Sequence, residues 1–203
     1  MTDIRYTAAW VADDAEHRPP DVAFAMAADW IEAQPNGQPL LVTPVRQQSA
    51  FPAITRFANA HSATTLGSGR SFRHSGPVLA YAPDYEMMDL ATEVASDASL
   101  AVVETIEYPM IGWAMEVHAI DLVTGEVTPD TRTESQRREL DQVYFYGNNG
   151  WSPAFDRERA TTVLRPLLSE PGMTKDIVLG HMIAKGANGK GIARLAKLID
   201  SIR

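Results

Sequence analysis

The stretch PVLAYAPDYEMMDLATEVASDASLAVV, residues 77–103, consists of two short apolar runs separated by a helical pattern. The first run, residues 77–83, is apolar throughout, and Met87, Leu90 and Ala91 then recur at the spacing of one helix face. Runs without polar alternation are typical of strands covered on both faces, as in parallel sheets. The stretch therefore predicts a strand–helix–strand unit.

The same layout occurs once more, upstream of this stretch. An apolar run at residues 39–45 is followed by three polar residues and by a helical pattern at residues 50–60. The prolines that start the two runs, Pro39 and Pro77, lie 38 residues apart, which suits successive βαβ units. Residues 62–66 form a possible short strand between the units. We therefore expect a Rossmann-like α/β fold, with a mainly parallel sheet of three to five strands and flanking helices.

The remaining segments are less uniform. The N-terminal stretch before Pro20 reads as irregular and acidic. Residues 109–122 fit either a helix opened by Pro109 or a strand over the later part. A capping box at Thr133 opens a charged helix, and the last fifty residues read as three helices. We expect an acidic α/β body over residues 1–150 and a basic C-terminal three-helix region over residues 151–203.

Composition places the chain among ordinary globular proteins. Of its 203 residues, 45% are hydrophobic and 22% are charged. It has no cysteine, which excludes disulfides, thiolate zinc sites and a cysteine nucleophile. Because no long apolar window and no signal-peptide pattern is present, we expect a cytoplasmic protein without a membrane partner.

The charges are distributed unevenly along the chain. Residues 1–150 carry nine arginines and no lysine against 21 acidic residues, a net charge of −12, whereas residues 151–203 carry nine basic residues against five acidic ones, a net charge of +4. A basic end on an acidic body permits a polyanionic partner at that end. Chance clustering of the four lysines is the alternative explanation.

Ligands of open parallel sheets bind beyond the carboxyl ends of the strands. At the predicted strand ends the polar residues are Arg46, Gln47, Asp84, Glu86 and Glu104. These residues are the default candidates for a pocket. For Asp84 the sequence favours the simpler role of capping the helix that follows it.

A basic island lies between the two units. Its centre, GSGRSFRHSG at residues 67–76, offers backbone N–H groups and two guanidinium groups that could bind a phosphate or a carboxylate. It lacks a phosphate-loop fingerprint, and a solvated surface loop is the favoured alternative. The predicted ligand-binding residues are Arg46, Arg70, Arg73, His74, Asp84 and Glu104.

The sequence contains no recognisable catalytic triad and no clear metal site. Asp84, Glu86 and Asp89 could contact a divalent cation, but residues two apart diverge on a helix. Whether the chain is an enzyme, and whether it needs a cofactor, therefore stays open. No metal is predicted.

The C-terminal segment HMIAKGANGKGIARLAKL, residues 181–198, resembles the register of a helix-turn-helix, with Gly186 in the turn. On the second helix the apolar residues share one face, and the basic residues share the other. Such a face could contact phosphates, although any surface helix has a charged face. The predicted nucleic-acid-binding residues are Lys185, Lys190, Arg194 and Lys197.

Three functional hypotheses follow. The leading one is a nucleic-acid-linked accessory or regulatory protein, in which an α/β scaffold carries the C-terminal helix pair. The second is a small enzyme or binding domain for a phosphorylated or carboxylated metabolite. The third is a protein-interaction module.

Overall fold

The computed structural model describes residues 6–14, 16–35, 37–44, 52–65 and 74–202. Within these ranges the chain forms a six-stranded sheet in which all paired strands are parallel, in the order β3-β2-β4-β5-β1-β6. The predicted Rossmann-like α/β fold is confirmed, with one strand more than the range of three to five. The strands are β1 (Thr7–Val11), β2 (Leu40–Val42), β3 (Ser62–Thr64), β4 (Val78–Tyr81), β5 (Ser99–Val103) and β6 (Ile120–Asp121).

Both predicted strand–helix units are present. The first unit is β2, α2 (Pro52–Ala60) and β3, and the second is β4, α4 (Tyr85–Val94) and β5. The strands β2, β4 and β5 are buried almost throughout, because helices cover both faces of the sheet. The absence of polar alternation was therefore the correct signal for these strands.

Two strands lie in segments for which the prediction was wrong or undecided. The N-terminal stretch is not irregular throughout, because it contains β1, which pairs with β5 and β6 inside the sheet. Residues 109–122 combine both predicted alternatives, since α5 (Ile111–Val117) is followed by the two-residue strand β6.

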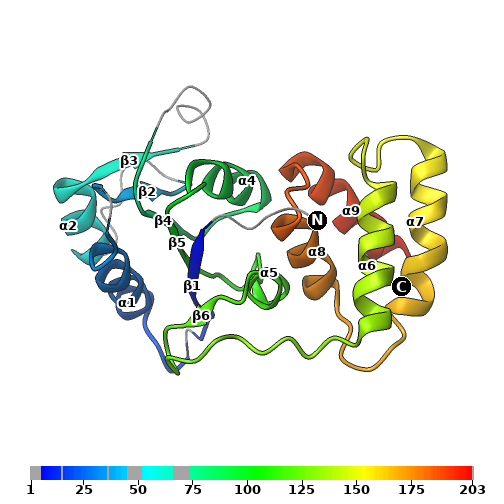
Figure 1. The fold of residues 1–203 in the computed structure, drawn as a ribbon, viewed down its shortest axis with the longest axis horizontal. Helices are drawn as coiled ribbons and strands as arrows, with labels where there is room; N and C mark the ends of the chain where they lie inside the picture. Colours follow the sequence, from blue (N-terminus) through cyan, green and yellow to red (C-terminus); the bar gives the residue numbers. More distant parts are fainter. Residues whose placement is uncertain (1–5, 15, 36, 45–51, 66–73, 203) are drawn as a thin grey trace.

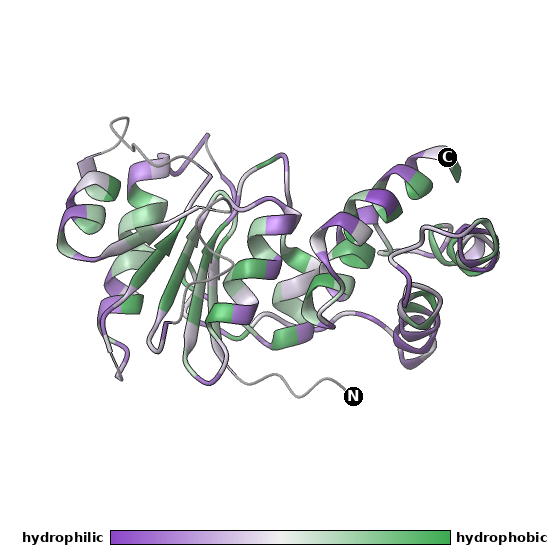
Figure 2. Ribbon diagram, turned by 90° about the horizontal axis from the view of Figure 1, so that it is seen from above, coloured by the Kyte–Doolittle hydropathy of each residue, from purple (hydrophilic) through white to green (hydrophobic). Residues whose placement is uncertain are grey.

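Successive strand residues point to opposite faces of the sheet and build two cores. Residues such as Leu41, Leu79 and Ala101 pack against α1 (Pro20–Glu32) and α2. Their neighbours in the same strands, such as Val42, pack on the other face with α4 and α5. The apolar strands lie between helices that turn their hydrophilic residues outward (Figure 2).

The C-terminal part is helical and lies beyond α4 and α5, on the side of the sheet opposite α1 and α2 (Figure 1). The predicted boundary at residue 150 falls between two helices that pack against each other, α6 and α7. The helices of this part are α6 (Glu134–Tyr146), α7 (Ala154–Leu167), α8 (Lys175–Ala184) and α9 (Gly189–Ile202).

The helical part is joined to the sheet through α5 and α8, which cross at very short distance. A Cβ atom added to Gly180 of α8 would collide with the backbone of Gly112 and Trp113 in α5. A Cβ added to Gly112 would likewise collide with the backbone of Ile177. The two glycines therefore allow the helix backbones to touch. As a result α8 packs directly against α5, which itself covers one face of the sheet.

Among the helices of the described ranges, none combines the length and the apolar character that crossing a membrane requires.

Candidate functional site

At two points in the sheet, neighbouring strands are followed by helices that cover opposite faces of the sheet. The helices after β1 and β2 cover one face, whereas the helices after β4 and β5 cover the other. The loops at the carboxyl ends therefore diverge between β2 and β4, and again between β5 and β1. Such switch points are where open α/β sheets bind their ligands.

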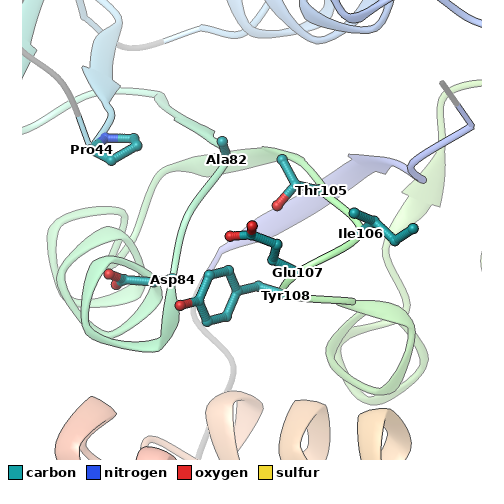
Figure 3. Close-up of a pocket in the computed structure, with 7 residues that line it drawn as sticks. All are labelled: Pro44, Ala82, Asp84, Thr105, Ile106, Glu107 and Tyr108. Atoms are coloured by element: carbon teal, nitrogen blue, oxygen red, sulfur yellow. The ribbon is translucent and has the colours of Figure 1, made fainter.

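A hollow of about 390 Å³ lies at the first of these points, and we call it the switch-point crevice. It is bounded by the ends of three strands that are far apart in the sequence. In Figure 3 the Tyr108 ring lies between Asp84 and Glu107, with Pro44 and Ala82 across the opening. Its lining residues are Pro44, Ala82, Asp84, Thr105, Ile106, Glu107 and Tyr108.

The backbone bends sharply where β4 reaches the crevice. Ala82 has φ = 49°, in the left-handed region that a residue with a side chain seldom adopts. Its N–H still donates to the carbonyl of Val103 at 3.0 Å, so the bend directly follows the last sheet hydrogen bond. Strained conformations of this kind cost on the order of 1–3 kcal/mol and cluster at functional sites.

A tight turn after β5 forms the opposite wall. The N–H of Tyr108 donates to the carbonyl of Thr105 at 3.0 Å, which leaves Ile106 at the tip with 80% of its surface exposed. The Tyr108 ring packs edge-on against Tyr85, the first residue of α4, with ring centroids 5.1 Å apart. Burial, reinforced by the charge of Asp176, raises the pKa of Tyr85 to about 12, so this hydroxyl stays protonated at neutral pH.

Asp84 caps α4 and also lies in the wall of the crevice. Its Oδ1 accepts a hydrogen bond from the N–H of Met87 at 2.8 Å, which caps α4 as predicted. The same carboxylate lines the crevice. Among the described residues its second oxygen has no hydrogen-bond partner, which leaves an acceptor for a ligand.

Glu104 lies at the second switch point, beside a small hollow of about 50 Å³ between the ends of β1 and β5. Its Oε1 accepts from the N–H of Asp13 at 3.0 Å, and its Oε2 accepts from the N–H of Met110 at 2.6 Å. Burial raises the pKa of this carboxyl group, and the two backbone hydrogen bonds oppose that rise. Both oxygens are thus occupied by backbone, and Glu104 holds the loops rather than presenting a free carboxylate.

Of the other predicted ligand-binding residues, His74 is the one that lies within the described ranges. Arg46, Gln47, Arg70 and Arg73 lie outside the described residues. His74 precedes β4, where its Nε2 lies 3.3 Å from the carbonyl oxygen of Pro77. It therefore lies at the amino end of this parallel sheet, a strand length away from Asp84.

The predicted nucleic-acid-binding residues fall into two groups. Lys190, Arg194 and Lys197 are exposed on the outer face of α9, and the Nη1 of Arg194 also donates to the carbonyl of Gly150 at 3.1 Å. The Nζ of Lys185, by contrast, is 3.0 Å from Asp141 and 3.3 Å from Glu116. Burial opposes its charge, but the hydrogen bond to Asp141 and the charge of Glu116 raise the pKa of Lys185. This lysine is therefore part of an internal ion network.

The resemblance to a helix-turn-helix is limited to the local register. Gly186 does occupy the turn, with φ = 79°. Helix α8 is buried from Ile177 to Ala184, and the first residue of α9, Gly189, lies against the backbone of Glu86 in α4. The amino end of α9, which would approach bases in that motif, is therefore covered by the chain itself.

A buried charge network between the sheet part and the helices was not predicted from the sequence. His181 is 1% exposed and lies within hydrogen-bond distance of Glu116 and Arg132, which are 65 and 49 residues away in the sequence. Neither a motif nor a periodic pattern connects positions so far apart. The contact between α5 and α8 brings Glu116 to His181, and the segment before α6 adds Arg132.

The carboxylates of this network are strongly stabilised in their charged form. Burial opposes ionisation of Glu116, but its hydrogen bond to His181 and the nearby Arg132 and Lys185 hold its pKa well below the usual range. For Asp130 burial has the same opposing effect, and the hydrogen bonds from Arg132 lower the pKa to about 2. Both groups are therefore charged at neutral pH.

The described residues contain no group of three or more histidine, aspartate or glutamate side chains placed to hold a metal ion. Comparison with protein families, with curated proteins and with solved structures found no match to this chain.

Proposed function

We propose that the chain is a binding domain for a small polar organic ligand, which it holds in the switch-point crevice. The observation that carries this proposal is the position of the hollow, at a point where the loops after β2 and β4 diverge. Ligands of open parallel sheets bind at such points. The strained backbone at Ala82 in the same wall adds support.

The lining indicates the chemistry of the ligand. Carboxylates such as those of Asp84 and Glu107 only accept hydrogen bonds, so a ligand must offer hydroxyl or amino donors to them. Tyr108, Ile106 and Pro44 supply apolar surface for a ring or a carbon chain. Nucleosides, polyols and organic amines combine these features.

A phosphorylated or carboxylated ligand remains the alternative that the sequence predicted. It depends on Arg46, Arg70 and Arg73, none of which is among the described residues. A ligand panel should therefore hold matched pairs, such as a nucleoside and its phosphate, or an amine and the corresponding amino acid.

Thermal unfolding with this panel tests the proposal. We expect at least one donor-bearing compound to raise the Tm of the wild-type chain, because a ligand that binds only the folded state stabilises it by mass action. The Asp84→Asn variant keeps an oxygen that can cap α4 but loses the charge, and Glu107→Gln removes the other carboxylate. Each variant should lose most of the ligand-induced shift.

Glu126→Gln is the matched control, because Glu126 is an exposed acid in the turn after β6, away from the crevice. It should keep the full shift. The proposal fails if no compound stabilises the wild type, or if the two crevice variants respond as Glu126→Gln does.

A second function, contact with nucleic acid, is favoured by the exposed basic face of α9. Lys190, Arg194 and Lys197 follow one another at spacings of four and three residues, which places them on one face. Because the amino end of α9 packs on α4, we propose that these residues contact phosphates and do not read bases.

Charge reversal tests this second proposal. The triple variant Lys190→Glu, Arg194→Glu, Lys197→Glu should abolish binding to duplex DNA and RNA, and wild-type affinity should fall steeply as salt is raised. Reversal of Arg138 and Arg165, which are exposed on α6 and α7, is the control. If the wild-type chain does not bind nucleic acid at low salt, this second proposal is wrong.

A further inference from the structure

Two phenylalanine rings are exposed beside the turn between α6 and α7. Phe145, in the last turn of α6, is 64% exposed, and Phe155, in the first turn of α7, is 57% exposed. Among the described residues no other phenylalanine, tyrosine or tryptophan is exposed to this degree. An exposed ring forgoes the favourable free energy of burial, so two such rings at one place on ordered helices indicate a binding surface.

The two rings belong to a continuous row of side chains across α6 and α7, which lie side by side (Figure 1). The ring centroids of Phe145 and Tyr146 are 5.9 Å apart. The guanidinium carbon of Arg159 lies 5.6 Å from the centroid of the Tyr146 ring and 3.9 Å from that of Phe155. The Tyr146 hydroxyl also accepts a hydrogen bond from Gln142 Nε2 at 2.9 Å. We call Phe145, Tyr146, Arg159 and Phe155 the aromatic row.

The guanidinium group of Arg159 adds a positive charge to the aromatic row. Its side chain is exposed, and no carboxylate pairs with it in the part of the chain that the structure describes. The preceding acid Asp156 accepts a hydrogen bond from the Asn149 side chain at 3.3 Å. A guanidinium group that lies over an aromatic face still has N–H donors with which it can bind a phosphate.

The aromatic row adjoins the basic face of α9 through the turn that connects α6 and α7. The carbonyl of Gly150 in this turn accepts a hydrogen bond from the Nη1 of Arg194 at 3.1 Å. A Cβ atom added to Gly191 would lie 3.0 Å from the Gly150 Cα, so the first turn of α9 packs on the same turn. Residues 189–197 carry three cations and no acidic residue. Exposed rings and unopposed cations therefore lie on neighbouring surfaces of the helical part.

We infer that the aromatic row stacks the unpaired bases of a single-stranded nucleic acid whose phosphates lie along the basic face of α9. Aromatic faces stack on bases of any sequence, and a positively charged surface beside them follows the backbone. In a duplex the bases stack on one another and present only their edges. The inference rests on the α9 contact proposed above, and it adds that the preferred form of the nucleic acid is single-stranded.

A second copy of the chain fits this surface less well. A stable dimer buries about 800 Å² per partner around an apolar core. Two aromatic side chains supply at most about 150–250 Å² each. The exposed side chains of the adjoining turn, Asn148, Asn149 and Ser152, are polar. The small apolar area and the neighbouring cations therefore favour a polyanion with aromatic bases over a protein surface.

Fluorescence anisotropy tests the inference with a labelled strand of about 15 deoxythymidines, alone and paired with its complement. We expect the wild type to bind the single strand more tightly than the duplex at the same low salt. The variant Phe145→Leu, Phe155→Leu keeps apolar side chains but has no rings. Its single-strand binding should be about 10- to 100-fold weaker, with duplex binding unchanged. Phe145→Tyr, Phe155→Tyr keeps both rings and is the matched control, which should bind as the wild type does.

The stacking inference and the α9 contact fail in different ways. The stacking inference is wrong if the wild type binds both forms equally, or if the leucine variant binds the single strand as tightly as the tyrosine variant does. Neither result affects the α9 contact. Single-strand binding that survives charge reversal of Lys190, Arg194 and Lys197 would instead contradict the α9 contact. A wild-type chain that binds neither form at low salt contradicts both.

Sedimentation analysis separates stacking from contact between copies of the chain. We expect the wild type and the leucine variant to sediment alike in the absence of nucleic acid. A wild-type dimer that dissociates in the leucine variant would assign the two rings to an interface between copies, and it would overturn the stacking inference.

Discussion

Glu104 shows that a polar side chain at a strand end can have a structural role instead of binding a ligand. It follows β5 directly, which is the position where a ligand-binding carboxylate is expected. Instead, its two oxygens accept the backbone N–H groups of Asp13 and Met110, and so tie the loop after β1 to the start of α5. Asp84 uses one carboxylate oxygen to cap its helix and also lines the crevice. Residues at equivalent strand ends therefore differ in whether a carboxylate oxygen is left to bind a ligand.

Replacing Glu104 by alanine should therefore destabilise the fold. Two backbone N–H groups would lose their acceptor, and leaving such groups unpaired costs about 1–3 kcal/mol. Urea unfolding monitored by circular dichroism measures the loss. Glu104→Gln retains one acceptor oxygen and should recover part of the stability. An alanine variant as stable as wild type would show that the loops do not depend on this carboxylate.

For individual residues, the sequence predicted which side chains lie at the strand ends better than it predicted what each side chain does there. Asp84 was predicted both as a cap and as a pocket residue because its place between an apolar run and a helical pattern is a local property. The partners of Glu104 are 91 and six residues away, and those of His181 are 49 and 65 residues away. Contacts at long separation depend on how whole elements pack, which local patterns do not contain.

The crossing of α5 and α8 is the element contact on which the position of the helical part depends. Gly112 and Gly180 let the two backbones meet, so the chain has small residues where a helix interior would otherwise favour alanine. The buried charge network then forms along the same contact, with Glu116 on α5 and His181 on α8.

Gly180→Ala distinguishes this packing role from helix propensity by the sign of its effect. Propensity alone predicts stabilisation by about 1 kcal/mol. We expect destabilisation by about 1–3 kcal/mol, because the added methyl group forces the backbones apart. Chemical denaturation of the two proteins gives the answer.

Gly191→Ala is the control for this comparison, since an added Cβ there would lie 3.0 Å from its nearest atom, the Gly150 Cα, and so requires a much smaller shift. A Gly180→Ala variant more stable than wild type would mean that α5 and α8 can separate without penalty.

Which elements could be predicted depended on burial. The runs of β2, β4 and β5 are covered on both faces and are therefore apolar without interruption, which makes them visible in the sequence. The strand β1 contains three small or polar residues, Thr7, Ala8 and Ala9, beside its Trp10 and Val11, and it was hidden in an acidic stretch. The two residues of β6 are too few to give a pattern.

For the whole molecule, the sheet and the helical part present different surfaces. The crevice at the carboxyl ends of the strands is lined by carboxylates, whereas the exposed face of α9 is basic. The division into an acidic body and a basic end was visible in the charge count. That Lys185 belongs to the interior, and that α6 packs with α7, became apparent only from the packing of the elements.

The most direct test of a ligand site in the switch-point crevice is backbone amide NMR of the wild-type chain during titration with the compound that gives the largest thermal shift. The proposal predicts that the saturable chemical-shift changes centre on Ala82, Asp84 and the turn from Thr105 to Tyr108. Changes that centre instead on the basic face of α9, or that are confined to positions outside the crevice walls, would contradict it.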